Sequence, residues 1–217
     1  MTSARNDMLQ RVRTALRDVP SRETPTDVAV ERRYRTDSDM PHDQIIEQFV
    51  ERVREYNATV RVVAMQALPT AIAESCAARG VHRLLAPMDI PQEWLPARVD
   101  VLLDEGLSYA QIDGVDGVLT GCALGIAQTG TIVLDGGPRQ GRRVITLLPD
   151  YHLCVVFADQ IVGLVPEAIA RLRSAVRDQH RALTFISGPS ATSDIELTRV
   201  EGVHGPRTLE VIVVTAG

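Results

Sequence analysis

Two short segments of the sequence have the residue types that bind anions. The first is Thr129-Gly130-Thr131, which lies between two apolar runs, and the second is Ser187-Gly188-Pro189-Ser190, which follows one. A glycine lets the backbone approach a ligand closely, and the neighbouring hydroxyls and backbone N–H groups are hydrogen-bond donors. Both segments therefore predict a site for a carboxylate or phosphate. The alternatives are a strand bend at Gly130 and a simple helix cap at Ser190.

A histidine in the C-terminal part of the chain is a candidate for proton transfer. His204 lies in the sequence G-V-H-G-P, shortly after Asp194 and Glu196. A histidine beside a carboxylate can act as a general acid or base near neutral pH. We therefore predict catalytic roles for His204, Asp194 and Glu196. The alternative is that Asp194 caps a short helix and that His204 hydrogen-bonds a backbone carbonyl.

Three arginines crowd one glycine-rich loop. They are Arg139, Arg142 and Arg143, in the sequence G-G-P-R-Q-G-R-R. Guanidinium groups bind carboxylates through paired hydrogen bonds, so the loop could hold an acidic substrate or partner. We assign Arg143 to the predicted substrate site. The alternative is a solvated hairpin tip.

The composition excludes several kinds of chemistry. All 23 basic residues are arginine, so the chain has no lysine for a P-loop, a Schiff base or a general base. Its three cysteines, Cys76, Cys122 and Cys154, are far apart in sequence, whereas zinc and iron–sulfur sites need closely spaced ligands. We therefore expect no metal or cofactor in this chain, and interpret Cys122 and Cys154 as small buried residues without a thiolate-activating neighbour.

Charge and hydropathy indicate the setting in which the chain works. The net charge of -5 argues against nucleic acid as the main partner. The few, scattered cysteines are typical of a reducing compartment, and no apolar run approaches the length of a membrane span. We therefore expect a cytoplasmic protein with no membrane span.

The elements that must position these residues follow from apolar periodicity. The 217 residues predict an N-terminal helix and polar linker over 1–40 and one α/β domain over 41–217. Strands are expected at 59–64, 81–86, 99–103, 144–148, 152–157, 183–187 and 209–215. Helices are expected at 8–16, 41–56, 69–79, 91–95 and 191–197, and from Pro166 onward with Ile169, Leu172 and Val176 inward.

The order of these elements predicts the sheet. Short β-branched segments alternate with helices up to about residue 103, which indicates βαβ units and parallel strands. After Gly117 the strands follow one another more closely, which favours an antiparallel or mixed portion. We therefore expect a mixed, mostly parallel sheet flanked by helices, with an N-terminal helical extension. In such sheets ligands bind at the carboxyl ends of the strands.

Four motifs together resemble the LUD domain of the LutC/YkgG family of lactate-utilization proteins. They occur in the family's order and read G-V-L-T-G-C-A-L-G-I-A-Q-T-G-T-I-V-L, R-R-V-I-T-L-L-P-D-Y-H-L-C-V-V, F-I-S-G-P-S-A-T-S-D-I-E-L and G-V-H-G-P-R-T-L-E-V-I-V-V. The resemblance covers the chain from about Gly117 to its end. One departure is Gln128, where an acidic residue is expected in many relatives.

The resemblance implies a fold and a role. The fold would be similar to the NagB/RpiA/CoA-transferase-like group of α/β proteins. The role would be as one component of a system that oxidises L-lactate to pyruvate, beside LutA-like and LutB-like partner proteins that carry the iron–sulfur clusters. The wide spacing of the cysteines agrees with clusters housed only in those partners.

Two other functions remain open at this point. The fold group suggests a stand-alone transferase or isomerase acting on an acyl-CoA or sugar phosphate, but no glutamate in a glycine-rich setting supports CoA transfer. The chain could also be a non-catalytic interaction subunit that uses the polar stretch from Val19 to Met40 as a docking arm.

Overall fold

A computed structural model of the chain describes residues 4–20, 22, 24, 31, 33–189, 191–193, 199–201 and 205–215. Residue contacts divide the chain into two units, Met1–Tyr34 and Arg35–Gly217. Within the described ranges, no helix is long and apolar enough to cross a membrane. The family-like motifs all fall in the second unit.

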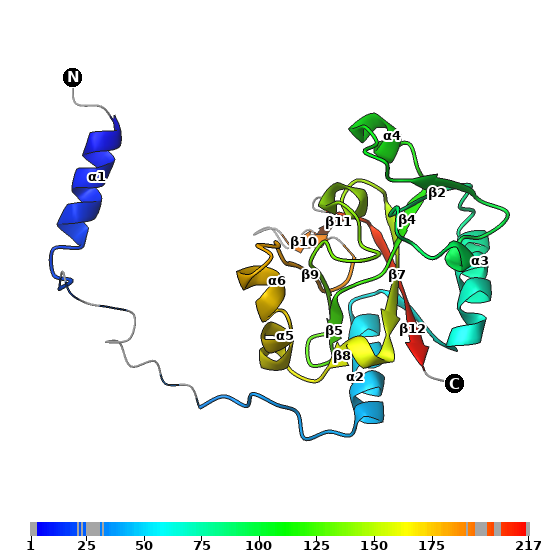
Figure 1. Ribbon diagram of the computed structural model, residues 1–217, viewed down its shortest axis with the longest axis horizontal. Coiled ribbons are helices and arrows are strands. Elements are labelled where there is room, and N and C mark those ends of the chain that lie inside the picture. The colour runs from blue at the N-terminus through cyan, green and yellow to red at the C-terminus, as the bar shows by residue number, and fades with distance from the viewer. Residues whose placement is uncertain are drawn as a thin grey trace. The chain divides into compact units, whose positions relative to one another are not determined.

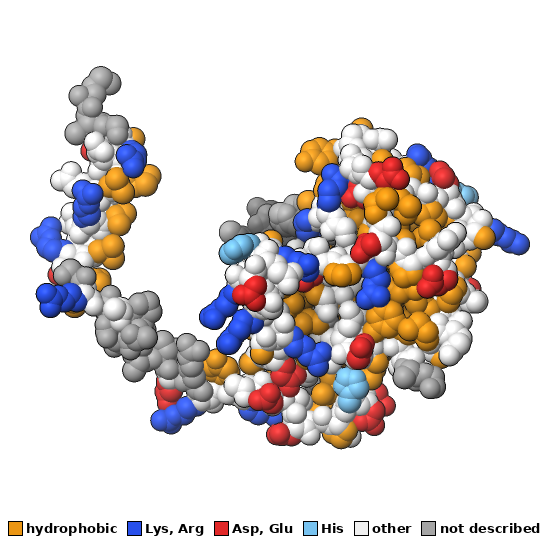
Figure 2. Space-filling view, viewed as in Figure 1, with side chains coloured by type: hydrophobic (Ala, Val, Ile, Leu, Met, Phe, Trp, Pro, Cys, Tyr) orange, Lys and Arg blue, Asp and Glu red, His pale blue; other side chains and the backbone are white. Residues whose placement is uncertain are grey.

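The first unit contains the expected N-terminal helix, α1 (Ala4–Ala15). Its apolar residues recur at helical spacing and gather along one side, while most of the basic side chains lie on another, as Figure 2 shows. None of its residues is buried, and Met8, Leu9 and Val12 are exposed by 66%, 39% and 48%. An isolated 12-residue helix is marginal in water, and no described residue of the first unit covers the apolar side of α1.

The main sheet of the second unit has six strands, all parallel. Their order is β1-β12-β7-β4-β2-β3 (Figure 1). The two central strands, β7 and β12, are almost continuously apolar and buried, as parallel strands covered on both faces must be. The strand bounds are Thr59–Ala64 (β1), Arg83–Ala86 (β2), Asp100–Leu103 (β3), Gly117–Thr120 (β4), Tyr151–Phe157 (β7) and Thr208–Thr215 (β12).

A second, smaller sheet contains the strands that follow β4. Its order is β8-β5-β6-β9, with β5 (Leu124–Ile126), β6 (Thr131–Leu134), β8 (Ile161–Val162) and β9 (Thr184–Ile186). Only the β5–β8 pair is parallel. The antiparallel portion expected after Gly117 is therefore present, but it forms a sheet of its own and the main sheet is not mixed.

Helices and the small sheet cover the main sheet in layers (Figure 1). Helix α2 (His42–Glu55) lies between the two sheets, where its stripe of buried residues joins a core with both. Helix α3 (Leu68–Ala78) covers the other face of the main sheet. Helices α5 (Val165–Arg171) and α6 (Arg173–Arg177) cover the outer face of the small sheet. The remaining helical elements are η1 (Met65–Ala67), η2 (Gln92–Trp94), α4 (Tyr109–Asp113), η3 (Arg143–Thr146) and η4 (Ala158–Gln160).

Three of the sequence expectations are wrong in detail. The segment 144–148 is not a strand: its β-branched residues lie largely in η3, which buries Ile145 and Thr146. On the α5–α6 segment, Ile169 and Val176 are 50% and 43% exposed. The buried residues are instead Ala168, Leu172 and Ala175, whose i, i+4, i+7 spacing is that of one helical face.

The expected helix over 191–197 is also not formed at its start. Residues Ala191–Ser193 form strand β10, which pairs antiparallel with β11 (Arg199–Glu201). Threonine and serine suit an extended strand as well as a helix cap, so the sequence pattern did not separate the two. Residues 194–198 lie outside the described part of the chain.

Candidate functional site

The two segments predicted to bind an anion are neighbours in the structure. Strands β6 and β9 pair antiparallel, with Ile132 opposite Ile186. This pairing brings the hydroxyls of Thr131 and Ser187 to 2.8 Å of each other, across 56 residues of sequence. The hydroxyl of Thr131 also lies 2.7 Å from that of Thr129. A short chain of hydroxyls therefore links the first segment to the second.

The two glycines of these segments lie against helix α2. A Cβ on Gly130, whose φ is +55°, would lie 2.7 Å from the carbonyl carbon of Arg52. A Cβ on Gly188, whose φ is +86°, would lie 2.5 Å from the Cβ of Tyr56, the residue that caps the helix. The close approach that these glycines permit is thus to the last turn of α2.

The first three residues of the second segment line a cavity of about 220 Å³. Four of its polar side chains, those of Arg143, Thr146, His152 and Ser187, come from three separate parts of the chain. A second hollow, of about 180 Å³, shares Arg143 and Thr146 with it. The cavity is lined by Arg143, Thr146, His152, Thr184, Phe185, Ile186, Ser187, Gly188, Pro189, Gly205, Pro206 and Leu209.

Arg143 gives this cavity its positive charge. Its guanidinium donates a hydrogen bond of 2.7 Å to the hydroxyl of Thr146, which is itself buried. Partial burial lowers the pKa of Arg143, and no acidic side chain among the described residues pairs with it. A guanidinium has more donors than one threonine can use, so Arg143 can still bind a carboxylate or phosphate.

His152 forms a buried polar wall of the cavity. Only 1% of its surface is exposed, and its Nε2 lies 2.8 Å from the hydroxyl of Thr120 on the neighbouring strand β4. His152 and Leu209 are the second residues of β7 and β12. The cavity therefore lies at the amino ends of these central strands of the main sheet. The Ser187–Pro189 loop that lines it follows the carboxyl end of β9, as expected for that loop, but β9 belongs to the small sheet.

Several predicted residues lie elsewhere or cannot be placed. Thr129, Gly130 and Thr131 do not line the cavity, and Gln128 is exposed with its N–H bonded to the carbonyl of Gly163. Residues Ser190, Asp194, Glu196 and His204 lie outside the described residues, so their predicted roles stay predictions. Gly205 and Pro206, the two residues that follow His204 in sequence, do line the cavity.

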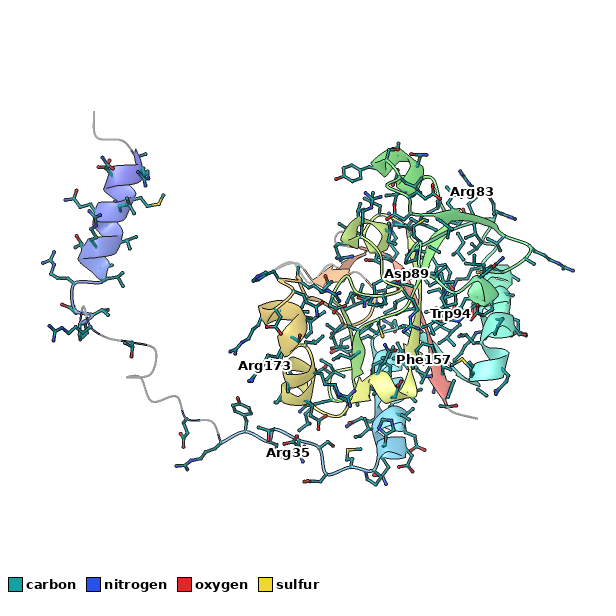
Figure 3. The ribbon with its side chains drawn as sticks, viewed as in Figure 1. Arg35, Arg83, Asp89, Trp94, Phe157 and Arg173 are labelled. Atoms are coloured by element: carbon teal, nitrogen blue, oxygen red, sulfur yellow. The ribbon has the colours of Figure 1, made fainter. Side chains whose placement is uncertain are left out.

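The other two arginines of the crowded loop have structural partners. Arg142 makes a two-armed ion pair with the nearly buried carboxylate of Asp104. The guanidinium of Arg139 lies over the rings of Trp94 and Phe157, 5.8 and 5.3 Å from their centres. Figure 3 shows Trp94 and Phe157 close together, beside Asp89, whose carboxylate accepts the N–H of Arg139. Of the three arginines, only Arg143 reaches the 220 Å³ cavity.

Sequence reasoning missed three polar residues of this cavity: Thr146, His152 and Thr184. The signal for His152 was present, because a lone histidine at the start of an otherwise apolar strand must bury a polar ring. Thr146 was not considered because the sequence predicted a strand at 144–148, whereas the residue lies in η3. Among the described residues, no three histidine, cysteine, aspartate or glutamate side chains could together hold a metal ion.

Comparison with known proteins gives a consistent set of relatives. The model of the LUD domain family matches residues 46–214. Lactate utilization protein C from Deinococcus radiodurans is 49% identical over 182 residues, which are 83% of this chain and 84% of that protein. The protein of the same name from a Geobacillus species is 33% identical over 143 residues, 63% of this chain and 57% of the relative. YkgG from Escherichia coli is 36% identical over 85 residues, 38% of this chain and 36% of the relative.

A solved structure also matches. The crystal structure of a DUF162 family protein from Deinococcus radiodurans superposes with a TM-score of 0.71 at 43% sequence identity. It covers 81% of this chain, and the match extends over 99% of that chain. The arrangement of the second unit is therefore one that a crystallised relative shares.

Proposed function

Because this chain belongs to the LUD domain family, we propose that it is the LutC-like component of a system that oxidises L-lactate to pyruvate. In this role it binds a small carboxylate in the cavity beside Arg143. The name of its relatives, Lactate utilization protein C, supports the pathway. The chemistry of the cavity supports the ligand class.

The single observation that carries the ligand class is the state of Arg143. It is a partly desolvated cation that no described acidic side chain neutralises, and it lies in a cavity with the Ser187 hydroxyl and the ring of His152. A carboxylate there would accept charge-assisted hydrogen bonds from the guanidinium. The hydroxyl and the imidazole could then bond the 2-hydroxyl or keto oxygen of a lactate-sized ligand.

Proton transfer belongs to the same proposal. Oxidation of lactate removes a proton from its hydroxyl, which needs a base in hydrogen-bond reach. We retain His204, with Asp194 and Glu196, as the candidates, because the cavity wall contains the residues that directly follow His204. His152 is a further candidate, since its ring already lines the cavity.

The electrons would leave through partner proteins. The three cysteines of this chain do not form a cluster site: Cys76 belongs to a different core cluster from Cys122 and Cys154, on the other face of the main sheet. An iron–sulfur cluster needs about four ligands close together. We therefore propose that LutA-like and LutB-like proteins hold the clusters, and that this chain needs them for turnover.

Replacing Arg143 with glutamine tests the site. We expect Arg143→Gln to weaken the binding of L-lactate and pyruvate by about 10- to 100-fold, since a hydrogen bond to a charged group contributes about 1.5–3 kcal/mol. Isothermal titration calorimetry of the full chain measures this directly. Arg173→Gln is the matched control, because it removes the same charge from the exposed surface of α6 (Figure 3).

The role in oxidation is tested with the partners present. Lactate-dependent reduction of a dye by the reconstituted three-protein system should fall with Arg143→Gln and stay unchanged with Arg173→Gln. Equal activity of the two partners without this chain would refute the proposal. Turnover of an acyl-CoA or sugar phosphate by the isolated chain would instead favour the transferase or isomerase alternative.

One observation favours a docking function in addition. The apolar side of α1 is exposed, with Leu16 56% exposed just after the helix, and three arginines of the helix outnumber its one acidic residue, Asp7. Such a helix suits an acidic groove on a partner protein. Deleting residues 1–40 should leave lactate binding unchanged and weaken association with the partners at least about tenfold. Size-exclusion chromatography and biosensor binding would measure both effects.

A further inference from the structure

Two of the three cysteines lie side by side in the core. Thr120 and Cys154 are opposite each other on the adjacent parallel strands β4 and β7, and Cys122 follows two residues after Thr120, just past the end of β4. The Sγ of Cys154 lies 3.7 Å from the carbonyl oxygen of Gly121. Both cysteines belong to the same core cluster, and each thiol is the largest influence on the pKa of the other. Residues 32 apart in sequence thus form one dithiol.

Polar groups around this dithiol favour its ionisation. The ring of His152 lies two residues before Cys154 on the same face of β7 and bonds the hydroxyl of Thr120. Hydrogen bonds from Cys122, His152 and Thr120 outweigh burial and lower the pKa of Cys154. The same thiol–thiol bond, together with burial, raises the pKa of Cys122. The pair therefore loses the proton of Cys154 easily and keeps the proton of Cys122.

A route from solvent reaches the pair. Cys122 lines a cavity of about 320 Å³ at the carboxyl ends of β4 and β7, together with Arg139 and Gln160. The side chain of Gln160 contacts the Sγ of Cys122 at 3.8 Å. The positive charge of Arg139 also favours an anionic sulfur at Cys122. A small polar molecule that enters this cavity meets Cys122 first and Cys154 behind it.

Cys76 provides an internal contrast. Its side chain is as inaccessible to solvent as that of Cys154, but it belongs to α3 and packs on the other face of the main sheet. Burial and the nearby carboxylate of Glu210 raise the pKa of its thiol to about 11. It has no second cysteine in its core cluster. Burial alone therefore does not account for the paired cysteines, or for the lowered pKa of Cys154.

We propose that Cys122 and Cys154 form a redox-active dithiol that a small hydroperoxide oxidises to an intramolecular disulfide. The Cys154 thiolate takes the proton of Cys122, and the sulfur of Cys122, which lines the cavity, attacks one peroxide oxygen; the O–O bond breaks, and a sulfenic acid and hydroxide form. The sulfur of Cys154 then attacks that of Cys122 and loses its proton, the S–O bond breaks and water leaves. Two thiols give up two electrons and two protons, and hydrogen peroxide ends as two waters.

The test counts thiols in the intact full-length chain. The reduced protein is treated with hydrogen peroxide, quenched, unfolded and titrated for free thiols. We expect the count to fall from three to one, with a mass loss of about 2 Da and a cross-linked peptide pair that contains Cys122 and Cys154. A thiol reductant should restore all three. His152→Gln should slow the reaction by at least about tenfold, because it removes one of the groups that stabilise the thiolate.

Matched variants separate this chemistry from general thiol oxidation. Cys76→Ser should leave the rate and the disulfide unchanged, while Cys154→Ser should stop at a sulfenic or sulfinic acid on Cys122. Reaction of Cys76 as fast as the pair, or loss of thiols without a Cys122–Cys154 bridge, would refute the proposal. If a variant fails to fold, the thiol count and the cross-linked peptide of the unmodified chain still test the proposal. It is also independent of lactate binding, so the proposed function can fail separately.

Discussion

Replacing Glu210 with glutamine is expected to lower the free energy of unfolding by about 3–5 kcal/mol, the usual cost of breaking a buried ion pair. The Glu210 side chain on the central strand β12 is only 3% exposed, yet it bonds Arg61 and Arg79, each at 3.1 Å. Ser75 and Tyr151 donate further hydrogen bonds to the same carboxylate. Glutamine would leave two guanidinium groups without their shared anion.

The effect should depend on pH. Burial alone would raise the pKa of Glu210, but the hydrogen bonds from Ser75, Arg79, Tyr151 and Arg61 outweigh it and hold the pKa below the ordinary value of 4.5. The unfolded carboxylate therefore takes up a proton before the folded one does, so this stabilisation is present above pH 4.5 and is lost as the pH falls below it. The stability difference from Glu210→Gln should shrink over the same range.

A matched control shares one of the arginines. Glu74 also pairs with Arg61 at 3.1 Å, but its side chain is 63% exposed. Exposed pairs contribute at most about 1 kcal/mol, so Glu74→Gln should change stability little at any pH. Urea unfolding between pH 3 and 7 would measure both variants. Equal effects of the two would show that the buried cluster does not stabilise the sheet.

Gly130→Ala is expected to destabilise the chain by about 2–5 kcal/mol, the sum of left-handed backbone strain and overpacking. The added Cβ would lie 2.7 Å from the carbonyl carbon and 2.9 Å from the Cβ of Arg52. Helix α2 would have to move away from the β5–β6 turn. Because Gly130 precedes Thr131 directly, the Thr131–Ser187 hydrogen bond should weaken with it.

Gly80→Ala separates the two contributions. Gly80 ends α3 with a φ of +65°, close to that of Gly130, but nothing lies within 4 Å of an added Cβ. It should therefore show only the strain of about 1–2 kcal/mol. Thermal unfolding of both variants gives the difference that belongs to the contact with α2. Equal losses of stability in the two variants would mean that α2 moves away from the added Cβ at Arg52 without a measurable cost.

The sequence predicted the parallel sheet and part of the site. Strands 59–64 and 209–215 were recognisable because buried parallel strands are continuous apolar runs. We expected the two segments to form one anion pocket. The 2.8 Å contact between the hydroxyls of Thr131 and Ser187 shows that the segments are neighbours, but only the second segment lines the cavity.

The rest of the site depended on pairings that local patterns do not contain. The sequence predicted a strand at 183–187, but it did not separate the strands at 124–126 and 131–134, nor did it show that all three form a sheet apart from the main one. That separation places the cavity at the amino ends of β7 and β12. For the same reason Cys122 and Cys154 read as isolated apolar residues, since strands that pair in space are not consecutive in sequence.

The position of β12 has a consequence for how the chain folds. This strand follows every other strand in sequence, yet it is inserted between β1 and β7 in the middle of the main sheet. Until residues 208–215 arrive, β1 has no neighbour in that sheet and the edge of β7 is open to other chains. Long-range pairing of this kind is slow, so a nascent or truncated chain should depend on chaperones to avoid aggregation.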